Sequence, residues 1–149
     1  MMQPPDNKPS VFLDTNVVAS YLTGEPSSSQ LFSSEILGRI HAAVNPTVMQ
    51  ELLLLSEVRE HPDMLDEIEQ ELSILPLNLD KADEYLKQAT SLRNRIAHSN
   101  DILILSSASD CDYLVTYDLA LGETLTDIST SKTKVVTPDQ LVSQLKSKV

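Results

Sequence analysis

The sequence predicts an α/β domain with a mostly parallel sheet and helices on both of its faces. Short runs of apolar, β-prone residues alternate with longer stretches of helical periodicity, which is the element order of parallel α/β folds. The chain has 149 residues, of which 41% are hydrophobic, enough for one domain with a substantial core. Only three glycines occur, which argues against a Gly-rich phosphate loop and a turn-rich β sandwich. We expect one domain over residues 11–149, after a polar, proline-rich tail over residues 1–10.

The first half of the chain alternates apolar runs with helical stretches that begin at recognisable signals. Asn45 and Pro46 predict a helix start, with Asn as the cap and Pro in the first turn, and Pro76 favours an edge position for its strand. The strands expected here are Val11–Asp14, Ile40–Val44 and Ser73–Leu77. The expected helices are one that starts near Val17 with Thr15 and Asn16 as caps, Gln30–Leu37 after a loop over Thr23–Ser29, Asn45 to Arg59, and Asp63–Leu72.

The second half of the chain continues the same alternation. The strands expected here are Asp112–Thr116, which is rich in β-prone residues, and Lys134–Val136. The expected helices are Asp80–Arg95 with Asp80 as the cap, Ser99–Asp110, a short one near Asp118–Glu123, and Pro138–Lys146 with Thr137 as the cap. Four consecutive apolar residues, 102–105, make the helix expected over Ser99–Asp110 apolar nearly all round. We therefore expect its start to lie against the edge of the sheet.

The composition excludes several classes of protein. The net charge of −11 decides against a nucleic-acid coat protein, which would be basic, although a nuclease could still use a local basic patch. The single cysteine, Cys111, precludes an internal disulfide and fits a reducing compartment. The N-terminus lacks the apolar segment of a signal peptide, and no apolar run approaches the roughly 20 residues of a membrane span. We therefore expect a cytoplasmic protein without membrane contact.

Four acidic residues occupy positions that local structure alone explains poorly. Asp14 and Asp118 follow predicted strands, Asp101 lies in the first turn of the apolar helix, and Glu51 has mostly apolar neighbours on its helix face. Strand ends and helix starts converge at one edge of a parallel sheet. Carboxylates gathered there repel one another and need a divalent cation, and oxygen ligands select Mg²⁺ or Mn²⁺ over zinc. The pattern indicates metal-dependent hydrolysis of a phosphodiester.

Each of these acids also has a simpler interpretation. Asp14 and Asp118 are able to serve as turn or cap residues for the helices that follow them. The helix dipole favours Asp101 in a first turn whatever its function. Glu51 could extend from the edge of the apolar stripe to water. The set of four is therefore more informative than any one member.

The segments that contain the four acids resemble those of the PIN domain family in their order and spacing. These segments are FLDTNVV, PTVMQELLL, DILILSSA and YLVTYD, which lie between residues 12 and 118, and KVVTPDQLV is similar to the last strand and helix of the family. The chain most closely resembles the ribonuclease toxins of type II (VapBC-like) toxin–antitoxin systems. The resemblance implies a three-layer α/β/α fold with a central, mostly parallel sheet of about five strands.

The resemblance also implies a site and a reaction, namely endonucleolytic cleavage of single-stranded or looped RNA. The implied Mg²⁺ or Mn²⁺ site consists of Asp14, Glu51, Asp101 and Asp118, with Asn16 and Thr116 in support. The implied partners are the RNA substrate, an antitoxin protein and a second copy of the chain in a homodimer. Arg93 and Arg95, shortly before Asp101, are candidates for phosphate contacts, and they would equally complement the dipole at a helix end.

Four other functions compete with this one. A haloacid-type phosphatase needs Asp-x-Asp after the first strand, and a receiver domain needs adjacent acids there, but Asp14 is followed by Thr15 and Asn16. A PIN-fold scaffold protein without useful activity fits the acidic surface, although four unneeded buried carboxylates would be costly. The segment Glu57–Glu71, with seven acids and one arginine, is typical of a solvated helix face. The remaining alternative is a nuclease inhibited by a partner that fills its groove.

Overall fold

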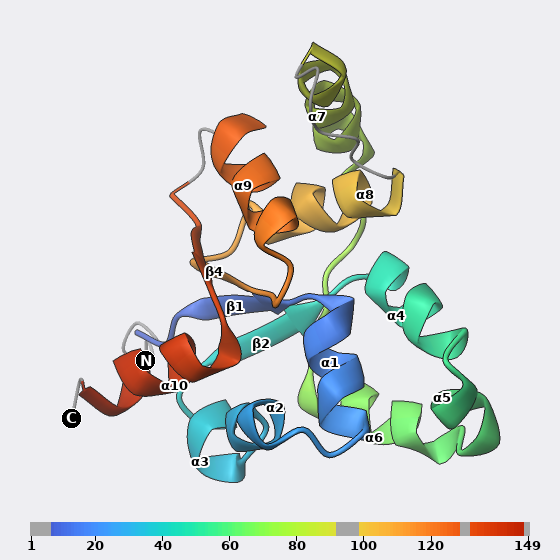
Figure 1. Cartoon of the computed structure of the whole chain (residues 1–149), viewed down its shortest axis with the longest axis vertical. Coiled ribbons are helices and arrows are strands. Elements are labelled where there is room, and N and C mark those ends of the chain that lie inside the picture. The colour runs from blue at the N-terminus through green and yellow to red at the C-terminus, as the bar shows by residue number, and fades with distance from the viewer. Residues whose placement is uncertain (1–6, 92–98, 129–131, 148–149) are drawn as a thin grey trace, which may run out of the picture.

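A five-stranded, all-parallel sheet forms the middle layer of the chain, with helices on both of its faces (Figure 1). The computed structural model describes residues 7–91, 99–128 and 132–147. The strands are β1 (Ser10–Leu13), β2 (His41–Val44), β3 (Ser73–Ile74), β4 (Tyr113–Val115) and β5 (Lys134–Val136). This arrangement confirms the predicted three-layer α/β/α fold.

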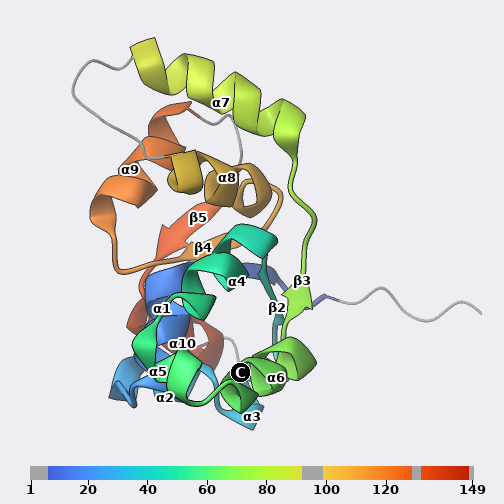
Figure 2. The ribbon, with the colours of Figure 1, turned by 90° about the vertical axis from the view of Figure 1, so that its right-hand side faces the viewer.

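The helices divide into two layers. They are α1 (Thr15–Leu22), α2 (Pro26–Leu31), α3 (Ser34–Leu37), α4 (Pro46–Leu53), α5 (Ser56–Glu60), α6 (Asp63–Glu71), α7 (Leu79–Ser91), α8 (Ser99–Ala108), α9 (Leu119–Ile128) and α10 (Pro138–Ser147). Figures 1 and 2 show α7, α8 and α9 on one side of the sheet and α1, α2, α3 and α10 on the other. Among the described residues, no helix is both long enough and apolar enough to cross a bilayer.

The strand order fixes where a site belongs. The sheet has the order β3-β2-β1-β4-β5, so the chain runs outward from β1 to β3 and then returns to β4 on the other side of β1. The order reverses between β1 and β4, where Leu13 is aligned with Val115. Ligands of open parallel sheets bind outside the carboxyl ends of the strands at such a switch point. The residues that follow Leu13 and Val115 therefore occupy the expected position of a site.

The core forms around the two strands at the switch point. Val11, Phe12 and Leu13 of β1 are completely buried, as is Leu114 of β4, because helices cover both faces of the central strands. In α8, Ile104 and Leu105 are also buried, and Leu103 is half-buried. The apolar run in α8 thus packs against the core as predicted, with contacts between α8 and β1.

The structure divides the helix expected over Gln30–Leu37 into two shorter ones. The α2 helix begins at Pro26, inside the segment expected to be a loop, and ends at Leu31. Phe32 then leaves the helix and stacks on Tyr21 with ring centroids 4.1 Å apart, and Ser33 caps α3 by accepting a hydrogen bond from the Ile36 backbone N–H. The prediction of one helix was wrong because a tertiary ring contact and a local cap together end the first helix.

A second break falls within the helix expected from Asn45 to Arg59. The α4 helix ends at Leu53, Leu55 adopts an extended conformation, and α5 starts at Ser56. No glycine or proline marks this break. Leu55 packs partly buried against the core, and such tertiary packing overrides the high helix propensity of leucine. Both α5 and α6 expose all of their acidic side chains, as expected for a solvated face.

Several ends of elements also differ from expectation. Asp14, rather than Thr15 or Asn16, caps α1, and the side-chain oxygen of Asn78, rather than Asp80, accepts the first-turn N–H of α7. The β3 strand is shorter than expected but lies at the sheet edge as predicted, and α9 extends to Ile128. The cap of α10 is confirmed: Thr137 and Gln140 exchange hydrogen bonds between side chain and backbone, as in a capping box.

Candidate functional site

Asp14 lies at the switch point and is held there from two sides. It follows β1 directly and is buried, with only 6% of its surface exposed. Its Oδ1 accepts a 2.8 Å hydrogen bond from the Thr15 backbone N–H, and its Oδ2 accepts a 2.7 Å hydrogen bond from the Thr116 hydroxyl. Because Thr116 follows β4, this second bond joins the carboxyl ends of the two strands. Thr116 thus supports the carboxylate, as the family resemblance implies.

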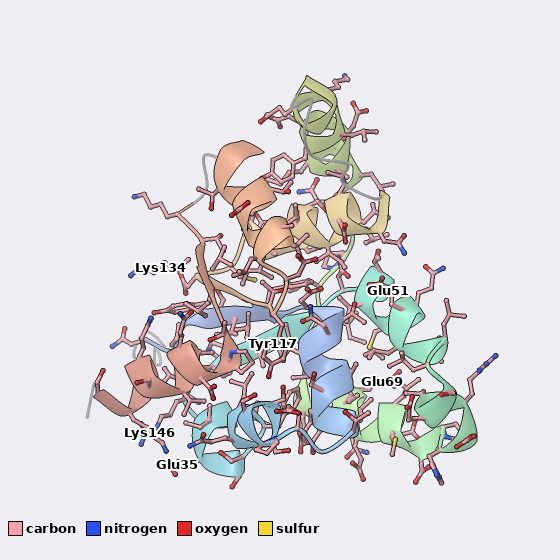
Figure 3. All side chains as sticks on the ribbon, in the orientation of Figure 1. Glu35, Glu51, Glu69, Tyr117, Lys134 and Lys146 are labelled. Carbon is pink, nitrogen blue, oxygen red and sulfur yellow. The ribbon has the colours of Figure 1, made fainter. Side chains whose placement is uncertain are left out.

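Glu51 reaches the same place from α4. Its Oε1 accepts a 2.5 Å hydrogen bond from the Thr15 hydroxyl, and the side chain is half-buried (Figure 3). The helix that carries it is fixed by Asn45, which is completely buried and caps α4 by accepting from the Val48 N–H. The Asn45 side-chain amide also donates to the Leu103 carbonyl and the Ser107 hydroxyl at 3.1 Å each. The start of α4 is therefore anchored to α8.

Asp101 adds a third negative charge from α8. It lies in the first turn of that helix and is half-buried. Its charge, like that of Glu51, acts on Asp14 and raises the pKa of the Asp14 carboxyl. Asp14, Glu51 and Asp101 therefore lie near enough to one another at this end of the sheet for the charges of Glu51 and Asp101 to act on Asp14.

The electrostatics of Asp14 are unfavourable for an ionised carboxylate. Burial raises its pKa most, the hydrogen bonds from Thr116 and Thr15 oppose that rise, and the charges of Glu51 and Asp101 add to it, which brings the pKa to about 6. Among the described residues, neither Asp14 nor Glu51 forms an ion pair with a lysine or arginine. Within the part of the chain that the structure describes, Asp14 and Glu51 thus have no basic side chain paired with them that would offset their repulsion.

Asp118 is placed differently from the other three acids. Its side chain is exposed, and its Oδ1 accepts hydrogen bonds from the Ala120 and Leu121 backbone N–H groups, so it caps α9. Its own backbone N–H donates to the Thr116 hydroxyl at 2.9 Å. Asp118 is thus linked to Asp14 through Thr116, while its carboxylate has the simpler role that the sequence also allowed.

Asn16 fastens the start of α1 to the segment after β4. Its Oδ1 accepts a 3.3 Å hydrogen bond from the Tyr117 backbone N–H. Two adjacent connections therefore cross the switch point, one from Asp14 to Thr116 and one from Asn16 to Tyr117. Supporting roles of Asn16 and Thr116 in a metal site stay a prediction. Arg93 and Arg95 lie outside the described residues.

The chemistry of the site suits a hard cation. The side chains that meet there offer carboxylate and hydroxyl oxygens, which Mg²⁺ and Mn²⁺ prefer, and a divalent ion would relieve the charge on the buried Asp14. In the conformation described for residues 7–91, 99–128 and 132–147, no three Asp, Glu, His or Cys side chains are grouped closely enough to hold a metal ion. Binding by all four acids therefore requires side-chain rearrangement, above all of Asp118, whose Oδ1 accepts from the first turn of α9.

Thr15 contributes to the site through two hydrogen bonds, because it donates to Asp14 through its backbone and to Glu51 through its hydroxyl. Tyr117 was not assigned a role, although an aromatic residue beside Asp118 is conspicuous in a chain with 4% aromatic residues.

A surface depression of about 460 Å³ between β3, α7 and α8 is lined by none of the predicted site residues.

Comparisons with known proteins agree with this architecture. The chain resembles VapBC2 of Rickettsia felis bound to a DNA fragment from their promoter, with a TM-score of 0.63 and 19% identity over 85% of this chain and 98% of that one. It also resembles FitAcB from Neisseria gonorrhoeae, with a TM-score of 0.65 and 19% identity over 86% of this chain and 97% of that one. A toxin–antitoxin complex from Klebsiella pneumoniae is similar too, with a TM-score of 0.62 and 16% identity over 86% of this chain and 97% of that one. No curated protein sequence matches the chain. The PIN domain model matches residues 10–120, which is more than half of the sequence, and the chain therefore belongs to the PIN domain family.

Proposed function

We propose that this protein is a metal-dependent endoribonuclease of the toxin type, which hydrolyses phosphodiester bonds of RNA with Mg²⁺ or Mn²⁺. The observation that carries the proposal is the buried Asp14, which has the negative charges of Glu51 and Asp101 nearby and no basic residue paired with it among the described residues. Such an arrangement is costly unless a cation occupies it. The location at the switch point between β1 and β4 supports a ligand site.

The residues of the site have distinct roles in this proposal. Asp14, Glu51, Asp101 and Asp118 would hold the metal, which when bound lowers the pKa of water and offsets the charge that develops on phosphate. Thr116 and Thr15 orient the Asp14 carboxylate, and Thr15 also fixes Glu51. To reach the metal, the Asp118 carboxylate would give up its hydrogen bonds to the first turn of α9. Arg93 and Arg95 are proposed to contact phosphate oxygens.

The proposed partners follow from the family and the similar structures. One of those structures is a toxin–antitoxin complex, which supports an antitoxin protein as a partner of this chain. The protein has a net charge of −11, which repels RNA. A bound basic partner would offset part of this negative charge. We further propose that the chain forms a homodimer and acts in the cytoplasm.

The decisive experiment measures cleavage of a mixed pool of single-stranded RNA with Mn²⁺, with Mg²⁺ and with EDTA. The wild type is compared with Asp14→Asn and Asp101→Asn, and Asp139→Asn on the exposed face of α10 controls for the loss of one charge. The proposal expects metal-dependent cleavage in the wild type and the control, and its loss in both site variants. Absence of cleavage together with no metal-induced rise in melting temperature would refute it.

A second candidate function has its own supporting observation. Every acid of the segment Glu57–Glu71 is exposed on α5 and α6, which forms an acidic face suited to a basic protein rather than to RNA. A PIN-fold binding protein with little or no nuclease activity would use this face. It predicts that metal neither stabilises the chain nor promotes cleavage. The same thermal and cleavage measurements therefore separate the two functions.

A further inference from the structure

We propose that the ring of Tyr117 is a stacking platform for one unpaired base of the RNA substrate, adjacent to the acidic site. This inference rests on the proposed nuclease function and names the kind of group that the site recognises. It assigns to Tyr117 a substrate contact, whereas the four acids would hold the metal. Its consequence is a requirement for a base at one position of a single-stranded substrate.

Tyr117 is positioned by the same connections that build the site. It lies between Thr116, which donates to Asp14, and Asp118, and its backbone N–H donates to the Oδ1 of Asn16. In Figure 3 the residue lies beside α1, the helix that begins next to Asp14. The Tyr117 backbone therefore belongs to the segment that borders Asp14, so that a substrate bound at the acids would lie near this residue.

The ring is held at both ends. Asn16 fixes the backbone of Tyr117. The Tyr117 hydroxyl lies 2.5 Å from the Ser27 Oγ and 2.9 Å from the Ser28 Oγ, and both serines are at the start of α2. Ser28 is completely buried, so this anchor belongs to the framework rather than to a surface loop. A ring that is already fixed loses little conformational entropy when a base stacks on it.

The exposure of this ring sets it apart from every other aromatic residue in the chain. Phe12, Phe32, Tyr85 and Tyr113 are buried, and Tyr21 is half-buried and stacked on Phe32. Tyr117 is 38% exposed although both its ends are bonded. Leu119, two residues further along the chain, is 75% exposed.

The negative net charge of the protein favours a substrate contact that needs no positive charge. Phosphate binding normally relies on lysine and arginine, but the net charge is −11, and Arg39, Lys81 and Lys87 are each paired with an acid. Stacking of a base on an aromatic ring needs no positive charge and accepts every base. It also needs the base to be unpaired, which selects single-stranded or looped RNA over a duplex.

The test uses the full chain and a set of single-stranded RNA oligonucleotides of one cleavable sequence, in which one nucleotide at a time lacks its base. Initial rates with Mn²⁺ give KM and kcat for the wild type, Tyr117→Leu and Tyr117→Phe. Leu86→Ala, which trims a half-exposed leucine of α7, is the matched control. Melting temperatures of all variants are recorded alongside.

We expect Tyr117→Leu to raise KM about tenfold or more, in line with the loss of one stacked base, while Tyr117→Phe changes it by less than about threefold. One abasic position should raise KM of the wild type by a similar factor and have no further effect on Tyr117→Leu. That non-additivity separates a base contact from a structural role. If Tyr117 had only a structural role, Tyr117→Leu would lower the melting temperature, and Tyr117→Phe would show the same defect.

Two outcomes overturn the inference and are distinguishable. If the wild type cleaves RNA but no single abasic position raises its KM, or if the abasic penalty persists in Tyr117→Leu, the stacking role is wrong and the nuclease function stands. If the wild type shows no metal-dependent cleavage, the nuclease function fails and the stacking role fails with it. If Tyr117→Leu does not fold, the wild-type abasic series still overturns the inference when no abasic position raises KM.

Discussion

Thr15 links two carboxylates of the site, because its backbone N–H donates to Asp14 at 2.8 Å and its hydroxyl donates to Glu51 at 2.5 Å. The carboxylates come from different elements, one from the end of β1 and the other from α4. A single small residue thereby sets how far apart two like charges lie. Hydrogen bonds to ionised carboxylates are among the stronger ones in proteins, so this link is a substantial part of the site.

Replacing Thr15 by valine tests that link. Thr15→Val keeps the β-branched shape and the backbone N–H but removes the hydroxyl donor, so Glu51 loses its partner. We expect metal affinity, measured by calorimetric titration with Mn²⁺, to fall roughly tenfold, as is typical when a residue that orients a ligand is removed. Thr15→Ser retains the hydroxyl and should bind metal like the wild type. Equal affinities for the valine and serine variants would contradict the assigned role.

The raised pKa of Asp14 predicts how stability depends on pH without metal. The pKa is about 6 in the folded chain against 3.8 for an unperturbed aspartate, so the folded state holds this proton more tightly than the unfolded state. The contribution of Asp14 to stability therefore declines as pH rises from about 4 to 6, by about 3 kcal/mol in total. Asp14→Asn cannot titrate and escapes this loss.

Urea denaturation in EDTA at pH 4 and pH 7 measures the effect. The unfolding free energy of Asp14→Asn minus that of the wild type should increase by roughly 2 kcal/mol between the two pH values, because part of the total is already lost at pH 4. Asp139→Asn controls for the removal of one exposed charge. A difference that does not change with pH would mean that Asp14 is not the buried, repelled carboxylate described above.

The two roles of Asp118 can be separated by substitution. Asparagine caps helices as well as aspartate does, whereas alanine does not, so Asp118→Asn should keep the stability of the wild type and Asp118→Ala should lose about 1 kcal/mol. If Asp118 also holds metal, both variants should lose metal-dependent cleavage. Thermal unfolding and RNA cleavage measured on the same preparations give both answers. Full cleavage by Asp118→Asn would restrict the residue to capping α9.

Gly122 is required where α9 packs against β5. A Cβ at this position would lie 2.6 Å from the Cγ1 of Val135, whose branched side chain cannot rotate away freely. We expect Gly122→Ala to destabilise the chain by about 1–3 kcal/mol in urea denaturation, as is usual for overpacking. Combining Gly122→Ala with Val135→Ala should recover part of that loss relative to the sum of the single variants. Strict additivity would show that the clash is not the cause.

The sequence was sufficient to predict the structure where local signals and the overall topology agree. The parallel fold, the edge position of β3 and the cap at Thr137 all follow from patterns of a few residues placed on a parallel sheet. The family resemblance placed Asn16 and Thr116 beside the site, and their contacts agree with it.

Local patterns failed where distant residues decide the conformation. The break at Leu55 has no local stop signal and accompanies packing against the core, and at Phe32 the stacking on Tyr21 acts together with the cap at Ser33. The link from Thr15 to Glu51 joins residues 36 positions apart, and Ser27 and Tyr117 are 90 positions apart. Such pairings become visible only when the elements have been placed in space.

The bond between Asp14 and Thr116 joins residues 102 positions apart, on strands that are neighbours in the sheet. During synthesis, Asp14 and Glu51 leave the ribosome long before β4 exists, so the first strand must wait for a partner that is made late. Contacts so distant along the chain form slowly, since a long loop has to close before they contribute. A nascent chain interrupted before Thr116 therefore lacks an assembled site. The order of strands thus delays assembly of the site until β4 has been synthesised.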